Sequence, residues 1–274
     1  MHAASDPLAR SPLLRALARP RAIALACIGA LAACGWIYLG LVLSGQNSTG
    51  LLRALCAPLT GTGSPGSTAL TLAMWCAMVL AMMLPTAAPM VMTYADLAEA
   101  AAAKGEAAVS PMVLVGGYIA VWLGAALVLT ALQILLARIG VLDSYMGVAN
   151  PFIAGAMFFA AGLYQFSALK HACVSQCQHP FRFFFGHWTA DPRGVFRIGL
   201  RQGLYCLGCC WAMMLLMFAV GLMNVVWMAI LGVVMAIEKL GTTARFSRIA
   251  GVAFIAIGLI IIIETSVTGW PKPG

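Results

Sequence analysis

Long apolar stretches, separated by short polar or basic segments, run through most of the 274-residue sequence. In a soluble domain about a quarter of the residues are charged. Here 62% of the residues are hydrophobic and only 9% are charged, so the chain cannot cover a water-exposed surface. The stretches are long enough to cross a hydrocarbon core of about 30 Å as helices. The sequence therefore predicts an all-α fold, a polytopic helical membrane bundle.

We expect about seven transmembrane helices. The apolar run 203–237 is too long for one ordinary crossing, and two spans within it give the count of seven. The alternative is six spans, if this run is a re-entrant hairpin or one long tilted helix. Gly221 and Asn224 indicate a turn within that run. The expected spans are 22–43, 69–92, 112–137, 151–169, 203–220, 224–237 and 249–266.

The distribution of positive charge predicts the orientation of these spans. With the N-terminus in the cytoplasm, only Arg53, Arg138 and Lys272 of the 16 Lys and Arg residues fall outside. Cytoplasmic loops carry an excess of Lys and Arg, so this partition favours seven spans with a cytoplasmic N-terminus. The net charge of +8 thus reflects topology, and we expect a lipid bilayer and no nucleic acid as partner.

The expected organisation has one membrane domain and little else. Residues 1–21 form a cytoplasmic N-terminal segment, and residues 22–274 form a single transmembrane helical domain. Its outer loop is 46–67, rich in Gly, Pro, Ser and Thr, and its longest inner segment is the Cys/His-rich cytoplasmic loop 170–202.

Sulfur is concentrated at the start of the fifth span, in GLYCLGCCWAMMLLM at 203–217. At about 100° per residue, one side of a helix carries Cys206, Cys209, Cys210, Met213 and Met217. A buried cysteine is often a small packing residue, but three thiols within five residues favour a functional site. We therefore expect a metal site at the cytoplasmic side of this span.

The inner loop adds ligands of the same kind. LKHACVSQCQHP at 169–180 contains His171, Cys173, Cys177 and His179. If this segment is helical, the two cysteines, four residues apart, lie on one side and can share an ion. Thiolates and thioethers suit Cu(I), whereas a mixture of Cys and His also suits Zn(II). Interfacial histidines can equally contact water or lipid headgroups.

The second span provides a possible counterpart in MWCAMVLAMMLP at 74–85. Met74, Met78 and Met82 share one face of a helix, and Cys76 lies on another. Such a stripe serves packing as often as metal contact. Pro85 predicts a bend that frees a backbone carbonyl.

Polar residues near the ends of spans have simpler expected roles. Glu238 and Lys239 follow the sixth span and mark its cytoplasmic end. Tyr164 and Gln165 are candidates for hydrogen bonds between helices. The first-span cysteines, Cys27 and Cys34, are expected to be packing residues.

Four segments together resemble a bacterial family of predicted metal-binding integral membrane proteins of unknown function. They are WCAMVLAMMLP (75–85), LYQFSALKHACVSQCQHP (163–180), GLYCLGCCWAMMLL (203–216) and MNVVWMAILGVVMAIEK (223–239). The CxGCCW core is the most specific of these motifs. The resemblance implies a multi-pass protein of the bacterial inner membrane and copper handling, with a soft-metal site made by Cys206, Cys209, Cys210, Cys173 and Cys177. It implies no demonstrated enzymatic reaction.

Three functions compete at this point. The first is binding of a soft metal ion, Cu(I) above all, with transfer to a metal chaperone or metalloenzyme assembly partner, or transport. The second is thiol-disulfide oxidoreduction by the CxxC at 206–209, against which the single outer Cys56 counts, because a relay needs a second pair. The third is an accessory subunit with structural zinc. The sequence favours metal binding over catalysis.

Overall fold

The computed structural model describes residues 20–45, 65–142, 147–186, 188–222, 224–241 and 245–268. Regular structure in these ranges is helical, apart from one isolated bridge between Leu142 and Val148. The helices are α2 (Pro20–Gly45), α4 (Pro65–Ala103), α5 (Pro111–Arg138), α6 (Pro151–Tyr164), α7 (Ala168–Gln178), α8 (Pro180–Phe185), α9 (Pro192–Val220), α10 (Val225–Leu240) and α11 (Arg245–Thr268).

Local sequence signals set where several helices begin. Ser110, Asn150 and Asp191 each accept a hydrogen bond from a backbone N–H of the first turn of α5, α6 and α9. Proline follows each of them as the first helical residue, where its missing N–H costs nothing. These proline-led caps place the starts of α5 and α6 where apolar stretches begin, whereas α9 begins at Pro192, before the apolar run that starts at residue 203.

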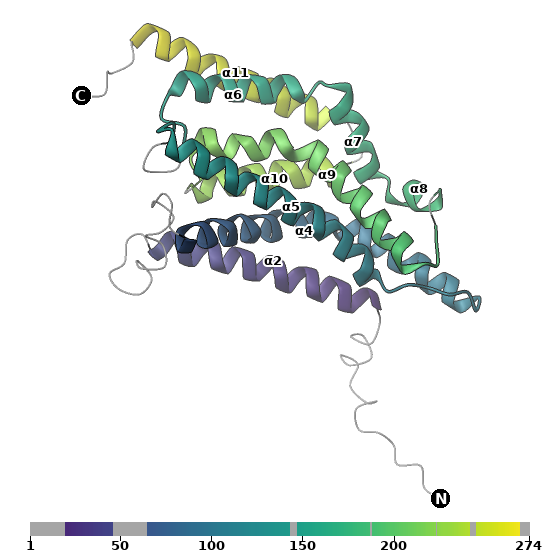
Figure 1. The fold of residues 1–274 in the computed structure, drawn as a ribbon. Coiled ribbons are helices and arrows are strands. Elements are labelled where there is room, and N and C mark those ends of the chain that lie inside the picture. The colour runs from purple at the N-terminus through teal and green to yellow at the C-terminus, as the bar shows by residue number, and fades with distance from the viewer. Residues whose placement is uncertain are drawn as a thin grey trace, which may run out of the picture.

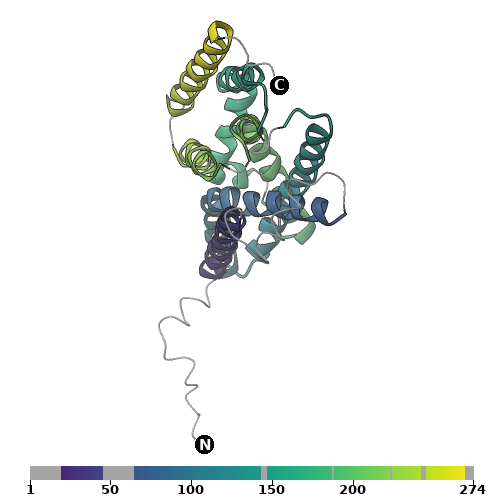
Figure 2. The same ribbon diagram turned by 90° about the vertical axis from the view of Figure 1, so that its left-hand side faces the viewer.

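The long helices lie side by side with similar axis directions, as Figure 1 shows, and Figure 2 views the bundle nearly end-on. α2 packs on α4, α6 packs on α11, and α9 lies between them in contact with α5, α6, α7 and α10. The short α7 and α8 lie at one end of the bundle, where α2 begins, whereas α11 ends at the opposite end (Figure 1). α9 is therefore the central helix.

Glycine permits the closest helix crossings. A Cβ on Gly258 of α11 would lie 2.7 Å from the carbonyl oxygen of Gly155 on α6, and one on Gly251 would lie 2.9 Å from the Gln165 Cβ. Small residues at such spacing are typical of helix pairs that pack in a membrane, where van der Waals contact drives association. The α6–α11 pair is thus held by close backbone approach.

Proline inside α4 links that helix to α2. α4 continues through Pro85 and Pro89 for 39 residues. Pro85 cannot donate to the carbonyl of Ala81, and the indole Nε1 of Trp36 on α2 donates to that oxygen instead at 3.1 Å. The freed carbonyl predicted from the sequence is therefore satisfied by the neighbouring helix.

The outer surface of the bundle is apolar, and the interior contains polar groups. Exposed side chains include Leu127, Val128, Val233 and Ile263. The interior holds a buried hydrogen bond of 2.7 Å from Trp75 Nε1 to Gln133 Oε1. This arrangement is that of a helical bundle adapted to lipid, since polar groups in a membrane face other helices.

Four described helices are long and apolar enough to cross a membrane, namely α4, α5, α9 and α11. α6 and α7 make a fifth if the pair counts as one broken span. The all-α fold is thus confirmed, whereas the count of seven spans stays a prediction. Most of the expected N-terminal segment 1–21 and outer loop 46–67 lies outside the described residues.

One expected span differs from the structure. Residues 151–169 do not form a single straight helix, because the chain bends by 65° between α6 and α7. Ser167 accepts a hydrogen bond from the N–H of Lys170 and so starts a new helix. The expected turn at 221–224 does separate α9 from α10, and Gly221 has a φ of 88° there.

Candidate metal site

Four cysteine side chains meet where α7 packs on α9. Cys206, Cys209 and Cys210 come from α9, and Cys177 comes from α7. The Cys209 and Cys210 sulfur atoms are 3.4 Å apart, and the Cys177 side chain lies close enough to Cys206 and Cys209 to interact with them. The three cysteines of α9 are at most 2% exposed. We call these four residues the thiol cluster.

Helical spacing and one glycine bring the cluster together. Residues three and four apart share a helix face, so Cys206 lies beside Cys209 and Cys210. A Cβ on Gly208 would lie 2.7 Å from the Cys173 sulfur atom, so α7 can approach α9 this closely only because residue 208 is glycine. The Tyr164 hydroxyl donates to the Gly208 carbonyl oxygen at 2.5 Å and fixes the α6–α9 contact beside it.

A lysine of α10 contacts the cluster. The Lys239 Nζ on α10 donates to Cys206 Sγ at 2.9 Å, to Thr86 Oγ1 at 3.1 Å and to Met83 Sδ at 3.4 Å. The Tyr118 hydroxyl on α5 also lies 2.9 Å from Cys206 Sγ. Lys239 and Tyr118 therefore contact the Cys206 sulfur atom directly, and Met83 and Thr86 of α4 hold Lys239 in place beside it.

A second buried lysine lies on the α7 side. Lys170 Nζ is 2.7 Å from Glu238 Oε2, and both side chains are at most 2% exposed. The same ammonium donates to the Cys209 carbonyl oxygen at 2.6 Å, and the Gln178 amide donates to the Glu238 carbonyl oxygen at 2.7 Å. This ion pair ties α7 to α9 and α10 directly beside the thiols.

Glu238 and Lys239 do lie at the end of the sixth expected span, in the last turn of α10, but marking that end is not their whole role. Both residues are buried, at 3% and 5% exposure. α10 contacts α4, α7 and α9, and these helices cover its last turns and supply partners for the charged groups. Burial of an ion in an apolar bundle is costly unless it is paired, so these residues belong to the site.

The inner segment that contains the other predicted ligands is mostly helical. Cys173 is buried on α7, one turn before Cys177, and its sulfur atom packs against Gly208. His171 is half-buried, and His179 is exposed with its Nδ1 3.1 Å from the Ser175 carbonyl oxygen. No described contact joins either histidine to the thiol cluster.

The methionines of α9 continue the sulfur stripe into the bundle. Met213 and Met217 are buried on the turns that follow the thiols. α4 and α9 do meet, since the rings of Trp75 and Phe218 are 5.6 Å apart. The sulfur stripe of α9 therefore lies on a helix that contacts α4, the second expected span.

The methionine of α4 that reaches the site is not one of those predicted. Met83 contacts Lys239, as described above, whereas Met82 packs toward Gly232 of α10. Met78 is buried, and Cys76 is half-buried. No described contact joins these last two side chains to the thiols. Sequence spacing defines the faces of α4 but not which face turns toward α9.

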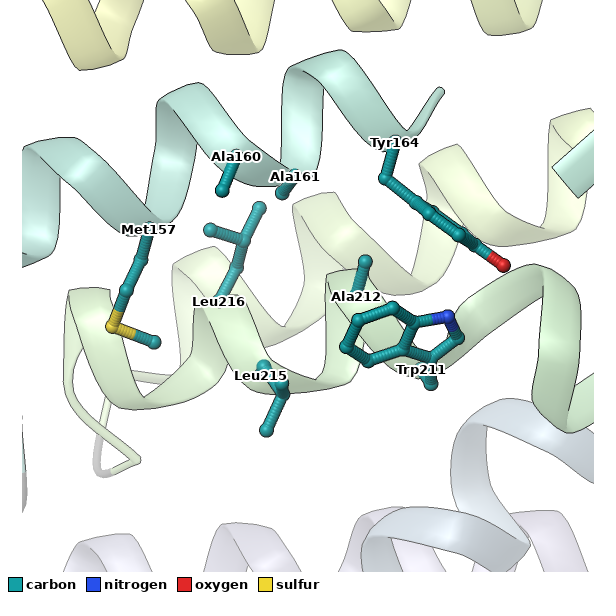
Figure 3. Close-up of a pocket in the computed structure, with 8 residues that line it drawn as sticks. All are labelled: Met157, Ala160, Ala161, Tyr164, Trp211, Ala212, Leu215 and Leu216. Atoms are coloured by element: carbon teal, nitrogen blue, oxygen red, sulfur yellow. The ribbon is translucent and has the colours of Figure 1, made fainter. Parts of the chain in front are cut away.

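An apolar pocket lies beside Trp211, the last residue of the CxGCCW motif of α9. Figure 3 shows it between α6 and α9, with the Trp211 and Tyr164 rings at one end. Its volume is about 130 Å³. The lining holds no charged side chain and no thiol, so the pocket differs chemically from the thiol cluster, which Lys239 contacts. The lining residues are Met157, Ala160, Ala161, Tyr164, Trp211, Ala212, Leu215 and Leu216.

The donor set of the thiol cluster fits a soft cation as cargo. Within the described ranges, no three or more His, Cys, Asp or Glu side chains are already arranged as a metal site. The three thiols of α9 nevertheless lie close together and buried, with the half-buried Cys177 beside them, and thiolate sulfur is the ligand that Cu(I) prefers. Binding would require small side-chain movements and loss of thiol protons.

The fold and site together define an all-helical protein with membrane-length apolar helices and a buried cluster of thiols. The chain belongs to the PpoB2 copper chaperone family, whose sequence profile matches residues 72–261, well over half of its length. This membership assigns a copper-related role to the chain and confirms the resemblance to a metal-related family. No curated protein and no solved structure matches the sequence.

Proposed function

We propose that this protein is a multi-pass protein of the bacterial inner membrane that binds Cu(I) at the thiol cluster and hands it on. Copper is the cargo, and a metal chaperone or a metalloenzyme assembly partner receives or supplies it. The observation that carries the proposal is the gathering of three buried cysteines on one side of α9, with Cys177 of α7 beside them.

The chemistry of the cluster favours a soft monovalent ion. Cys206, Cys209, Cys210 and Cys177 are the thiolate ligands in this proposal, and a sulfur site exchanges Cu(I) by replacing one ligand at a time. Met213 and Met217 then provide weaker thioether contacts further along α9. Cys173, on the same helix as Cys177, is a further thiol that could replace one of these ligands.

The distribution of charge supports a cytoplasmic location for the end with α7 and α8. Arg182 lies on α8, and Arg193, Arg197 and Arg201 lie on the first turns of α9, which begins at that end (Figure 1). Arg138 ends α5 at the opposite end. Because cytoplasmic segments are enriched in Lys and Arg, this asymmetry agrees with seven crossings and a cytoplasmic N-terminus.

Burial of the thiols argues against the oxidoreductase alternative. Disulfide exchange requires that a thiolate reach a sulfur atom of the partner. The cysteines of the CxxC are only 1–2% exposed, so exchange with a partner's disulfide requires that the partner's sulfur atom enter the bundle, whereas copper transfer requires only that the ion pass in or out. The structural-zinc alternative uses the same thiols and is separated from copper binding by experiment.

The first test is elemental analysis of the full chain, purified in detergent under reducing conditions and loaded with Cu(I). We expect near-stoichiometric copper in the wild type and loss of copper in the triple variant Cys206→Ser/Cys209→Ser/Cys210→Ser. The matched control is Cys27→Ser/Cys34→Ser, since both of these cysteines are exposed on α2 rather than packed as expected from the sequence. The control should retain copper.

Other outcomes identify the alternatives. Zinc in place of copper, together with lower thermal stability of the triple variant, would support a structural site. No bound metal, with a reversible disulfide at 206–209, would support the oxidoreductase. Equal copper in the wild type and the triple variant would refute the proposed site.

A further inference from the structure

We infer that a pocket at the start of α9 binds a phosphate group, with an anionic phospholipid headgroup as its source. The pocket lies between the first turns of α9 and the segment before that helix, and its volume is about 250 Å³. The inference goes beyond the proposed copper function, because the pocket shares no residue with the thiol cluster. The lining residues are Trp188, Thr189, Gly194, Arg197, Ile198 and Arg201.

The positive charge of the pocket comes from Arg197 and Arg201. These residues are four apart on α9, so their side chains lie on the same face of the helix. Both are exposed, and in the described part of the chain neither forms an ion pair. Two like charges at this spacing repel each other unless an anion lies between them. The pocket therefore favours a ligand with negative charge.

The nearest carboxylate in the sequence has another role. Asp191 is the cap of α9, where its Oδ2 accepts a hydrogen bond of 2.9 Å from the Gly194 N–H. Its side chain does not belong to the pocket lining. Because the cap uses this carboxylate within the first turn of α9, both guanidinium groups of the pocket stay available to a ligand.

The donors of the pocket match the oxygen atoms of a phosphate group. A guanidinium group presents its N–H donors in a planar fork, which binds phosphate through two parallel hydrogen bonds. Thr189 adds a hydroxyl group. Its Oγ1 accepts a hydrogen bond of 3.2 Å from the Asp191 N–H, so its own proton can be donated to a ligand.

The depth of the pocket favours a phospholipid as the source of the phosphate. The apolar run of α9 begins at residue 203, so at 1.5 Å per residue Arg201 and Arg197 precede it by about 3 and 9 Å along the axis. The headgroup region on each side of a bilayer is about 5–8 Å thick. Trp188 packs on Tyr94 with ring centroids 5.7 Å apart, and both residue types are enriched at this level. Basic pockets between helices at this level bind anionic headgroups.

The test is a titration of the full chain in detergent with dioleoylphosphatidylglycerol, followed by native mass spectrometry. Dioleoylphosphatidylcholine is the zwitterionic comparison, and inorganic phosphate, titrated separately by calorimetry, is the soluble probe. The pocket variant is Arg197→Gln/Arg201→Gln. The matched control is Arg182→Gln/Arg193→Gln, which removes two exposed charges from the same end of the bundle but outside the pocket lining.

We expect the wild type to bind phosphatidylglycerol more tightly than phosphatidylcholine. The pocket variant should weaken this binding by about tenfold or more, the effect of losing one hydrogen bond between charged groups. Because both arginines are exposed, the variant should still fold. The control should keep most of the affinity, since a surface charge outside the pocket is screened by salt.

Other outcomes change the source of the phosphate or overturn the inference. Binding of inorganic phosphate but not of phosphatidylglycerol, with the same dependence on Arg197 and Arg201, would keep the phosphate site and make its source soluble. Equal affinities of the wild type and the pocket variant, or equal losses in the pocket variant and the control, would overturn the inference. Copper content, measured on the same samples, should not change, so a failure of the copper proposal is detected separately.

Discussion

The contact between Gly208 and Cys173 leads to a prediction about how α7 closes on the thiol cluster. In Gly208→Ala the new Cβ would lie 2.7 Å from the Cys173 sulfur atom, where ordinary contacts are 3.4–4 Å. Overpacking of this kind costs about 1–3 kcal/mol, whereas alanine gains about 0.5–1 kcal/mol over glycine in a helix. We expect a net loss of about 1–2 kcal/mol in the free energy of unfolding.

The Cys173 sulfur atom is the main obstacle to a side chain at residue 208, so removing it should reverse the destabilisation. In Gly208→Ala/Cys173→Ala the nearest remaining atom is the Cβ of residue 173, at 3.6 Å, which is an ordinary contact. The double variant should therefore recover most of the lost stability. The assay is denaturant or thermal unfolding in detergent, with Cu(I) affinity as a second readout, because a displaced α7 also moves Cys177.

Gly124→Ala is the matched control for this pair of variants. A Cβ at residue 124 of α5 meets nothing within 4 Å, so alanine there should be neutral or slightly stabilising. The reasoning would be refuted if Gly208→Ala matched the control, or if removal of the Cys173 sulfur atom restored nothing.

Two further predictions concern buried polar contacts and are measured as unfolding midpoints in detergent. Lys170→Met should lower stability by about 3–5 kcal/mol because it leaves Glu238 charged and unpaired, and Lys170→Met/Glu238→Met should recover most of this loss. A double variant no more stable than the single one would contradict the ion-pair interpretation. Trp36→Phe should cost about 1 kcal/mol through loss of the hydrogen bond to Ala81, and this cost should shrink when Pro85→Ala restores an N–H within α4. An equal cost of Trp36→Phe with Pro85 and with Pro85→Ala would argue against the assignment of this hydrogen bond to the carbonyl freed by Pro85.

Spacing within one helix could be predicted from the sequence. The shared side of Cys206, Cys209 and Cys210 follows from helical geometry alone, and the structure confirms it. The hydrogen bond of Tyr164 to α9 was likewise expected for a polar group in an apolar helix.

Features that depend on how helices pack could not be predicted. The bend between α6 and α7 is set by the cap at Ser167, and the break itself, residues 165–167, contains no glycine or proline to indicate it. The rotation of α4 decides that Met83, rather than Met78 or Met82, contacts the site. The burial of Lys239 depends on neighbouring helices that are distant in the sequence.

The 65° bend before α7 has a consequence for the route of the ion. Three thiols lie on the central α9, and the fourth, Cys177, lies on a short helix that leaves the direction of the bundle. If these thiols hold the ion as proposed, a movement that parts α7 from α9 would open the cluster and remove one ligand in the same step. In that proposal the opened cluster always offers the ion fewer thiol ligands than the closed one, so entry and release are linked to coordination number.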